Sequence, residues 1–324
     1  MKKTIAVLIS VLLVLSLFAA CGKQPVQQPD PTEPANDTAK LNVVCSIFPP
    51  YDFVRTIAGD KVDLTLLLDS KTDLHSYSPT ADDIMKISQA DLFVNIGGES
   101  DDWAEDVIAS AANENLKVVS LIDLVNAVEE EALPGMQEEE EEHEEEEGPE
   151  YDEHVWTSLK NVIMIVPALT DTLCELDAAN ADFYRANSTD YLQSLQTLEA
   201  QYAETIGAAA RKTLLFADRF PFRYLADDYD LTCYAAFSGC SAETEASFET
   251  MTMLVDTVKE QNLPYILMID GSDGSVAESV SRQSGAAIRV LNSCQSVSAD
   301  DIAAGATYLS IMNDNLQVLN EVLN

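Results

Sequence analysis

The chain has 324 residues, of which 47% are hydrophobic and 23% charged, and its 56 acidic against 18 basic side chains give a formal net charge of −38. The hydrophobic content excludes a disordered chain, and the length suffices for one large or two modest domains. Because so negative a protein repels phosphates, we exclude nucleic-acid binding through charge. Three histidines do not make a polyhistidine metal store, and six cysteines are too few for a small disulfide-built fold.

Residues 1–20 predict an export signal that is not part of the fold. Lys2 and Lys3 precede an apolar run over residues 5–18, which is shorter than the roughly 20 residues a membrane span needs. The run ends in FAAC, and small residues before a cysteine resemble the lipobox of bacterial lipoproteins, in which Cys21 is lipidated. An ordinary secretory signal cleaved nearby is the alternative. We expect a protein anchored by lipid to the outer face of the cell membrane.

Residues 21–40 predict a lipidated tether. They contain four prolines, several glutamines and no apolar periodicity, which favours a semi-extended chain. Such a tether would let the folded part sample the membrane surface close to a partner.

Strand and helix patterns alternate from residue 41 onward. The expected strands cover residues 41–47, 62–68, 91–96, 117–122, 213–217, 231–237, 265–269 and 286–291. The expected helices cover residues 51–58, 80–89, 103–112 and, most clearly, 248–260, with Ser78 or Thr80 as the cap of the second. This alternation predicts an α/β fold with two parallel-sheet lobes, at residues 41–157 and 212–324.

Connecting helices are expected between the lobes, at residues 158–211. After Asn180, apolar side chains recur at intervals of three and four, at Leu192, Leu195, Leu198, Tyr202 and Ile206, and therefore share one helix face. As one helix, residues 178–210 would be about 50 Å long and would cross both lobes. Two helices that separate near Asn187 and Ser188 are the alternative.

Carboxylates concentrate in an acidic segment, residues 129–153, which contains no Lys or Arg. Such a block repels itself, so we expect an exposed, mobile loop. A solvated spacer is one interpretation. The other is a metal-collecting loop, in which His143, Glu142 and Glu144 bind divalent ions weakly and pass them inward.

The two other histidines suggest a metal site. His75 lies in TDLHSYSPT (residues 72–80), between a predicted strand and a capped helix, and His154 lies in YDEHVW (residues 151–156). Each follows an acidic residue by one or two positions, and a carboxylate can hold one ring nitrogen while the other binds zinc or a similar cation. A structural role for each lone loop histidine is the alternative.

The motifs around these histidines resemble those of one family, the substrate-binding lipoproteins of zinc and manganese ABC importers. DLHSYSPT (residues 73–80), together with QADLFVN (residues 89–95), is similar to the family's first signature, and DEHVW (residues 152–156) is similar to its second. ADFYRAN (residues 181–187) resembles the start of the family's backbone helix, and the stretch at residues 238–247 resembles a later segment. The resemblance extends from the first predicted strand to the C-terminus.

The resemblance implies two α/β lobes joined by a rigid helix, with one metal ion in the cleft between them. It also implies an ABC transporter membrane permease as partner. The acidic segment falls where zinc-specific members carry a His- and acid-rich loop, which favours Zn²⁺ over Mn²⁺.

The resemblance further implies four ligand positions, of which His75 and His154 match the first two. The third falls on Arg219, and a guanidinium has no lone pair to donate. The neighbouring Asp218, at the end of a predicted strand, is therefore our candidate. An Asp218–Arg219 ion pair of purely structural importance is the alternative.

The fourth ligand position falls on Asn292, whose amide oxygen can coordinate a metal weakly, with Cys294 as the other candidate. Asp218 and Asn292 both follow predicted strands, and parallel sheets bind ligands beyond the carboxyl ends of their strands. Cys240 lies in another such loop, and a Cys240–Cys294 disulfide is compatible with the sequence.

No enzyme motif is present: the sequence has no Gly-rich phosphate loop, no His-Glu-x-x-His helix and no Gly-x-Ser-x-Gly elbow. We therefore predict a monomeric, non-enzymatic solute-binding protein that captures zinc, or manganese, outside the cytoplasm and delivers it to an ABC permease. The alternative is a surface lipoprotein of the same fold whose altered metal site serves adhesion or metal buffering.

Overall fold

The computed structural model describes residues 40–69, 74–137, 151–241, 245–295 and 297–324. The predicted export signal, the lipidation site Cys21 and most of the tether lie outside the described residues. So do His143, Glu142 and Glu144 of the acidic segment. In the described part of the chain, no helix is both long and apolar enough to cross a membrane.

The first lobe is built on a four-stranded parallel sheet with the order β2-β1-β3-β4. Its strands are β1 (Leu41–Cys45), β2 (Val62–Leu66), β3 (Leu92–Asn95) and β4 (Lys117–Ser120). All four residues of the inner strand β3 are buried, as is typical of a parallel sheet covered on both faces. Because the strands are parallel, the loops that follow them lie at one edge of the sheet.

Three helices of this lobe are α2 (Phe48–Ala58), α3 (Ala81–Ser88) and α4 (Trp103–Ala109). Helix α2 begins three residues earlier than predicted, because Pro49 and Pro50 are tolerated in a first turn, where a backbone N–H has no helical partner. Thr80 caps α3: its Oγ1 accepts from the Asp83 N–H at 3.2 Å, and Asp83 Oδ2 accepts from the Thr80 N–H at 3.1 Å. The prediction of a cap is therefore confirmed for Thr80.

The second lobe contains another four-stranded parallel sheet, with the order β6-β5-β7-β8. Its elements are β5 (Thr213–Arg219), α7 (Arg223–Tyr229), β6 (Thr232–Phe237), α8 (Phe248–Glu260), β7 (Tyr265–Ile269), α9 (Ser275–Ser284), β8 (Ala287–Leu291) and α10 (Ala299–Ala303). The two sheets confirm the predicted pair of α/β lobes. Strand β5 continues two residues beyond its predicted end, so Asp218 and Arg219 belong to the strand.

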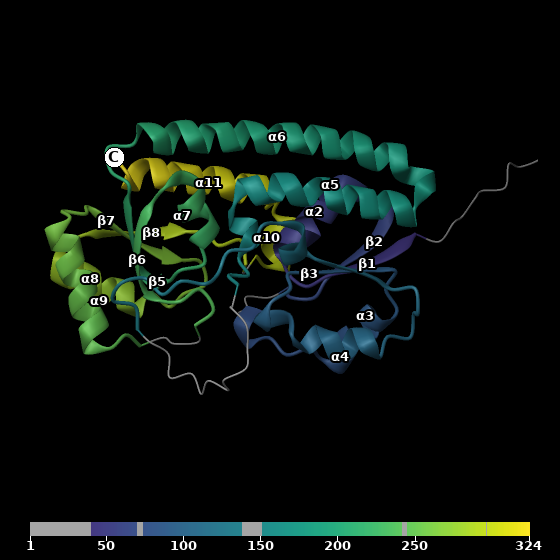
Figure 1. The fold of residues 1–324 in the computed structure, drawn as a ribbon, viewed down its shortest axis with the longest axis horizontal. Helices are drawn as coiled ribbons and strands as arrows, with labels where there is room; N and C mark the ends of the chain where they lie inside the picture. Colours follow the sequence, from purple (N-terminus) through teal and green to yellow (C-terminus); the bar gives the residue numbers. More distant parts are fainter. Residues whose placement is uncertain (1–39, 70–73, 138–150, 242–244, 296) are drawn as a thin grey trace, which may run out of the picture. The chain divides into compact units, whose positions relative to one another are not determined.

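Three long helices are α5 (Leu159–Leu176), α6 (Ala181–Ala208) and α11 (Tyr308–Val322), of which α6 runs along both lobes. Figure 1 shows α6 running above α11 and α5. Helix α11 lies on the side of the second lobe, and α5 and α2 lie on the side of the first. Asn187 Nδ2 donates to the Ile57 carbonyl of α2 at 3.0 Å, and Tyr202 Oη donates to the Met312 carbonyl of α11 at 2.6 Å. Helix α6 is unbroken at Asn187 and Ser188, so the two-helix alternative is wrong.

Hydrogen bonds also tie the lobes together at their junction. The buried Trp156 donates from Nε1 to the Ser293 carbonyl at 2.7 Å, and the Tyr308 hydroxyl donates to the Trp156 carbonyl at 2.7 Å. Asp52 of α2 accepts from the Tyr308 N–H at 2.7 Å. These bonds and an apolar core shared by both lobes favour only small relative movements.

The described ends of the acidic segment differ from the exposed loop predicted for residues 129–153. Leu133 and Met136 pack against the apolar core, and the Gln137 N–H donates to the Ala236 carbonyl of β6 at 3.0 Å. The apolar residues between the carboxylates supply the burial that the charge pattern alone did not predict. Residues 138–150 lie outside the described part of the chain.

Candidate metal centre

His75 lies in a short 3₁₀ turn, Leu74–Ser76, in the connection between β2 and α3. Leu74 is buried in the core and anchors this turn. The His75 side chain is only 6% exposed, and its Nδ1 lies 2.7 Å from Ser100 Oγ and 3.0 Å from Glu153 Oε1. These two oxygens face one ring nitrogen, which leaves Nε2 directed away from them.

His154 is held in a similar way at the start of the 3₁₀ turn Val155–Thr157. It is completely buried, and its Nδ1 lies 3.1 Å from Asp152 Oδ1, which also accepts from the His154 N–H at 2.9 Å. Burial lowers the pKa of His154, but the charge and hydrogen bond of Asp152 outweigh it and the pKa is raised. The imidazole is therefore held rigidly, with a carboxylate behind Nδ1.

The Nε2 atoms of His75 and His154 lie 3.3 Å apart, although the residues are 79 positions apart in the sequence. A carboxylate behind each Nδ1 favours a proton on that nitrogen and a lone pair on Nε2. Tetrahedral zinc with Zn–N distances of about 2.0–2.1 Å places two nitrogen ligands about 3.3–3.4 Å apart. The observed separation therefore suits two imidazoles that share one zinc ion.

Glu153 is buried beside both histidines, with 2% of its surface exposed. The Ser100 N–H donates to its Oε2 at 3.2 Å, and the Ser100 hydroxyl donates to its Oε1. Burial raises the pKa of Glu153, but the hydrogen bond with His75 and the charges of His154 and His75 outweigh it, so the pKa falls below its usual range. The lowered pKa favours the ionised form of Glu153, so the site contains a negative charge that attracts a cation.

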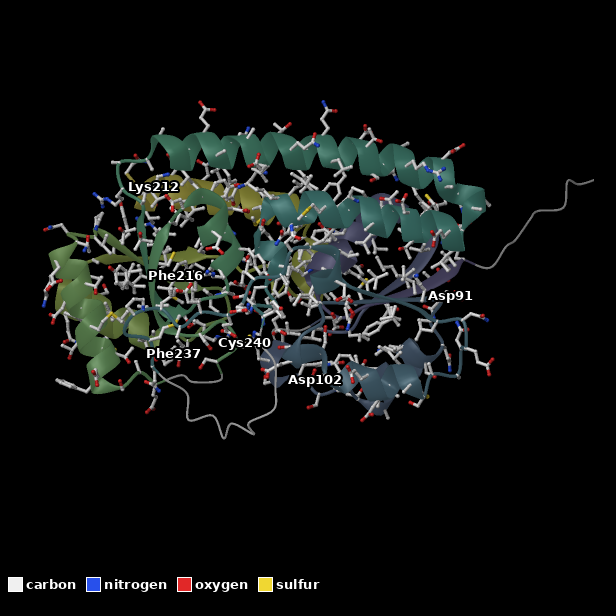
Figure 2. The ribbon with its side chains drawn as sticks, in the orientation of Figure 1. Asp91, Asp102, Lys212, Phe216, Phe237 and Cys240 are labelled. Carbon is white, nitrogen blue, oxygen red and sulfur yellow. The ribbon has the colours of Figure 1, made fainter. Side chains whose placement is uncertain are left out.

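Cys240 completes the cluster from the second lobe, in the loop that follows β6. One potential ligand atom each from His75, Glu153, His154 and Cys240 lies within 4.8 Å of the others. The Cys240 thiol donates to Glu153 Oε1 at 3.6 Å, and Figure 2 shows Cys240 at the side of the second lobe that faces the first. The four residues form a group that can hold a metal ion.

The loop that carries Cys240 is fixed at two points. A Cβ on Gly239 would lie 2.7 Å from Cε1 and 3.0 Å from Nδ1 of His154, so only glycine allows this close approach. The Arg219 guanidinium donates from Nη1 to the Ser241 carbonyl at 3.3 Å. The loop therefore docks directly onto the first lobe.

Asp218 and Asn292, the other two predicted ligands, have structural hydrogen bonds. Asp218 Oδ2 accepts from the Ile269 N–H of β7 at 3.2 Å, and its Oδ1 accepts from the Arg219 N–H at 2.9 Å. Asn292 Oδ1 accepts from the Cys294 N–H at 2.7 Å. Asp218 is not in the cluster that the described residues form, and backbone donors bind both of its oxygens. A ligand role for these two residues stays a prediction without support from this geometry.

Among the described residues, Cys45, Cys174, Cys233, Cys240 and Cys294 are all free thiols. The Cys240–Cys294 disulfide considered from the sequence is therefore not formed. Cys294 is buried in the apolar core, whereas Cys240 lies with the histidines.

Sequence reasoning missed Glu153 and Cys240 as members of the cluster. Glu153 directly precedes His154, so its proximity was available from the sequence. Cys240 had a weaker signal, because it follows a predicted strand and a glycine. Convergence of these loops depends on how the two lobes dock.

Residues 43–322 match the ZnuA family, described as "Zinc-uptake complex component A periplasmic". The chain is 32% identical over 312 residues to the high-affinity zinc uptake system protein ZnuA of Bacillus subtilis, covering 95% of this chain and 94% of that protein. It is 31% identical over 323 residues to the zinc-binding lipoprotein AdcA of Streptococcus pneumoniae, covering 98% of this chain. The chain spans only 61% of the length of AdcA.

Solved structures share this architecture. The Zn(II)-bound ZnuA-like domain of AdcA from Streptococcus pneumoniae aligns with a TM-score of 0.72 and 29% identity, over 88% of this chain and 99% of that one. The metal-dependent lipoprotein YcdH of Bacillus subtilis aligns with a TM-score of 0.73 and 28% identity, over 88% of this chain and 100% of that one.

Proposed function

The chain belongs to the ZnuA family of periplasmic zinc-uptake components, and from this premise we propose that it captures Zn²⁺ outside the cytoplasm and delivers it to the permease of an ABC importer. The names of its relatives, a zinc uptake protein and a zinc-binding lipoprotein, support zinc as the cargo. Because the chain spans only 61% of the length of AdcA, we propose zinc capture and delivery for this chain and no further activity of AdcA.

The observation that carries the proposal is the 3.3 Å separation of the His75 and His154 Nε2 atoms. Each imidazole has a carboxylate behind its Nδ1, which fixes the ring and raises the basicity of the nitrogen that faces the metal. The excess of acidic side chains over the whole chain attracts divalent cations toward the site.

Release of the ion follows from the same groups. Imidazole, carboxylate and thiolate bind a metal only without the competing proton, so acid weakens the site. The hydrogen bonds of Trp156 and Tyr308 at the junction resist wide opening of the lobes. We therefore expect a small displacement of the Cys240 loop, imposed by the permease, to be enough to release zinc.

The location and assembly state are part of the proposal. The apolar run over residues 5–18 and the FAAC sequence that ends at Cys21 support a lipid anchor on the outer face of the membrane, and residues 21–40 would tether a monomeric globule there. In the acidic segment, His143, Glu142 and Glu144 would collect ions for the site.

A zinc competition titration against a chromophoric chelator tests the proposed capture. We expect His75→Ala and His154→Ala to weaken zinc binding by more than roughly 100-fold, because each removes a nitrogen ligand. His143→Ala is the matched control, since it removes the third histidine of the chain outside the proposed site. Unchanged zinc affinity in both site variants would contradict the proposal.

A further inference from the structure

We propose that Cys240 is a metal ligand supplied by the second lobe, and that its sulfur makes the site select zinc and cadmium over manganese. This inference rests on the proposed function, because it specifies the donor set of the same metal site.

The position of Cys240 is the first argument. Its Sγ lies within 4.8 Å of a ligand atom of each of His75, Glu153 and His154, which come from the first lobe. Without Cys240, this group would contain donors from the first lobe only. A sulfur donor from the second lobe therefore makes the bound ion a bridge between the two halves of the protein.

The surrounding loop is the second argument, because it directs Cys240 into the site. The residue before Cys240, Gly239, packs against the His154 ring. The carbonyl of the residue after it, Ser241, accepts a hydrogen bond from Arg219. The backbone on both sides of Cys240 is thus held, which reduces the entropy lost when its sulfur binds an ion.

The remaining described cysteines differ from Cys240. Cys45, Cys174, Cys233 and Cys294 are buried among apolar residues of the core, and no potential metal site includes them among the described residues. Cys240 is partly exposed and lies next to two imidazoles and a carboxylate. Its environment is therefore that of a ligand rather than of a core thiol.

Coordination replaces one bond by another without any oxidant. The S–H bond of Cys240 breaks, a metal–sulfur bond forms, and the proton leaves to solvent with Glu153 Oε1 as its first acceptor, at 3.6 Å in the structure. Both electrons of the S–H bond remain on sulfur. One thiol proton is released for each metal ion bound.

The selectivity follows from the sulfur. Thiolates favour zinc and softer ions, whereas manganese prefers oxygen donors. Two imidazoles and one thiolate, with Nε2 atoms 3.3 Å apart, fit a tetrahedral ion better than the six oxygen-rich positions that manganese occupies.

Cobalt(II) is a direct probe, used on the intact metal-free protein. Tetrahedral Co²⁺ with a sulfur ligand gives intense visible d–d bands and a sulfur-to-cobalt charge-transfer band in the near ultraviolet. We expect both in the wild type, and we expect Cys240→Ser to lose the charge-transfer band while it keeps d–d absorption. Cys174→Ser is the matched control, because it changes a core thiol outside the site and should keep both bands.

Competition titrations provide the second readout. Cys240→Ser should weaken zinc and cadmium binding by at least roughly tenfold and leave manganese binding unchanged. The ratio of zinc affinity to manganese affinity should therefore fall. Cadmium added to the wild type should produce an ultraviolet sulfur-to-cadmium band, a measurement that does not depend on how well any variant folds.

The outcomes separate the two proposals. If wild-type protein binds cobalt and cadmium through His75 and His154 without any sulfur charge-transfer band, the ligand role of Cys240 is wrong and zinc capture stands. If the wild type binds zinc, cobalt and cadmium only at millimolar concentrations, zinc capture fails and the inference fails with it.

Discussion

Gly239 of the second lobe packs directly against the imidazole of His154 from the first, so closely that a Cβ would lie 2.7 Å from Cε1. The contact joins the two lobes at the metal site. It also means that the position of a metal-facing ring depends on the absence of one methyl group in a loop of the other lobe.

We expect Gly239→Ala to displace the His154 ring or the Cys240 loop and to weaken zinc binding by roughly 10- to 100-fold, as loss of a residue that supports a ligand does. Competition titration measures the change. Gly207→Ala is the control, because a Cβ there meets nothing within 4 Å. In helix α6 it should leave zinc affinity unchanged and stabilise the protein by about 0.5–1 kcal/mol. Equal affinities of the two variants would refute the proposed importance of the contact.

Ser100 orients two members of the site at once, since its hydroxyl donates to Glu153 and lies 2.7 Å from His75 Nδ1. Ser100→Ala should weaken zinc binding by roughly 10- to 100-fold without removing a ligand. Titration with Co²⁺ should still produce visible d–d bands at higher metal concentrations. Ser194→Ala on the exposed face of α6 serves as control. A Ser100→Ala protein with wild-type affinity would show that Glu153 and His75 need no such support.

The buried carboxyl of Asp101 should give the folding stability an unusual pH dependence. Burial raises the pKa of this carboxyl to about 6, although the Ile96 and Gly97 N–H groups donate to it. Between its ordinary pKa and about 6, the folded state binds the proton that the unfolded state has lost, so folding stability falls as the pH rises through this window. The free energy of unfolding falls by about 3 kcal/mol in total over this window, and this loss stays constant at higher pH.

Asp101→Asn removes this titration and retains an oxygen acceptor. In urea unfolding of metal-free protein, the variant should match the wild type near pH 4 and exceed its stability above about pH 6. Asp106→Asn, at an exposed position of α4, should show no such pH-dependent gain. A gap between Asp101→Asn and wild type that does not change with pH would exclude this role of Asp101.

Removal of residues 138–147 tests the proposed collecting loop. The deletion keeps Gln137, because its N–H donates to the Ala236 carbonyl and its side chain accepts from the Ser247 N–H at 2.6 Å. The affinity of the His75–His154 site should stay within a factor of about two, since His75, Glu153, His154 and Cys240 already form a cluster among the described residues. Uptake by cells at scarce zinc should slow. A large loss of site affinity would contradict a collecting role.

Local patterns in the sequence determined the secondary structure and the fold class. The strand and helix alternation, the Thr80 cap and the apolar face of α6 depend on residues a few positions apart, whose spacing directly reports which face is buried. Helix α8 was predicted with its observed ends, at residues 248–260. The sequence also singles out His75 and His154 as candidate ligands, because each follows an acidic residue in a motif that resembles a metal-binding family.

Only the tertiary structure decided which atoms meet at the site. The sequence favoured Asp218 as a ligand, but the strand extends past this residue and its carboxylate binds backbone N–H groups of β5 and β7. Cys240 reaches the histidines because the loop after β6 docks on the first lobe through Gly239. Such contacts depend on the relative placement of two lobes, a long-range property that local spacing does not encode, whereas the period of a strand or helix is fixed by its covalent geometry.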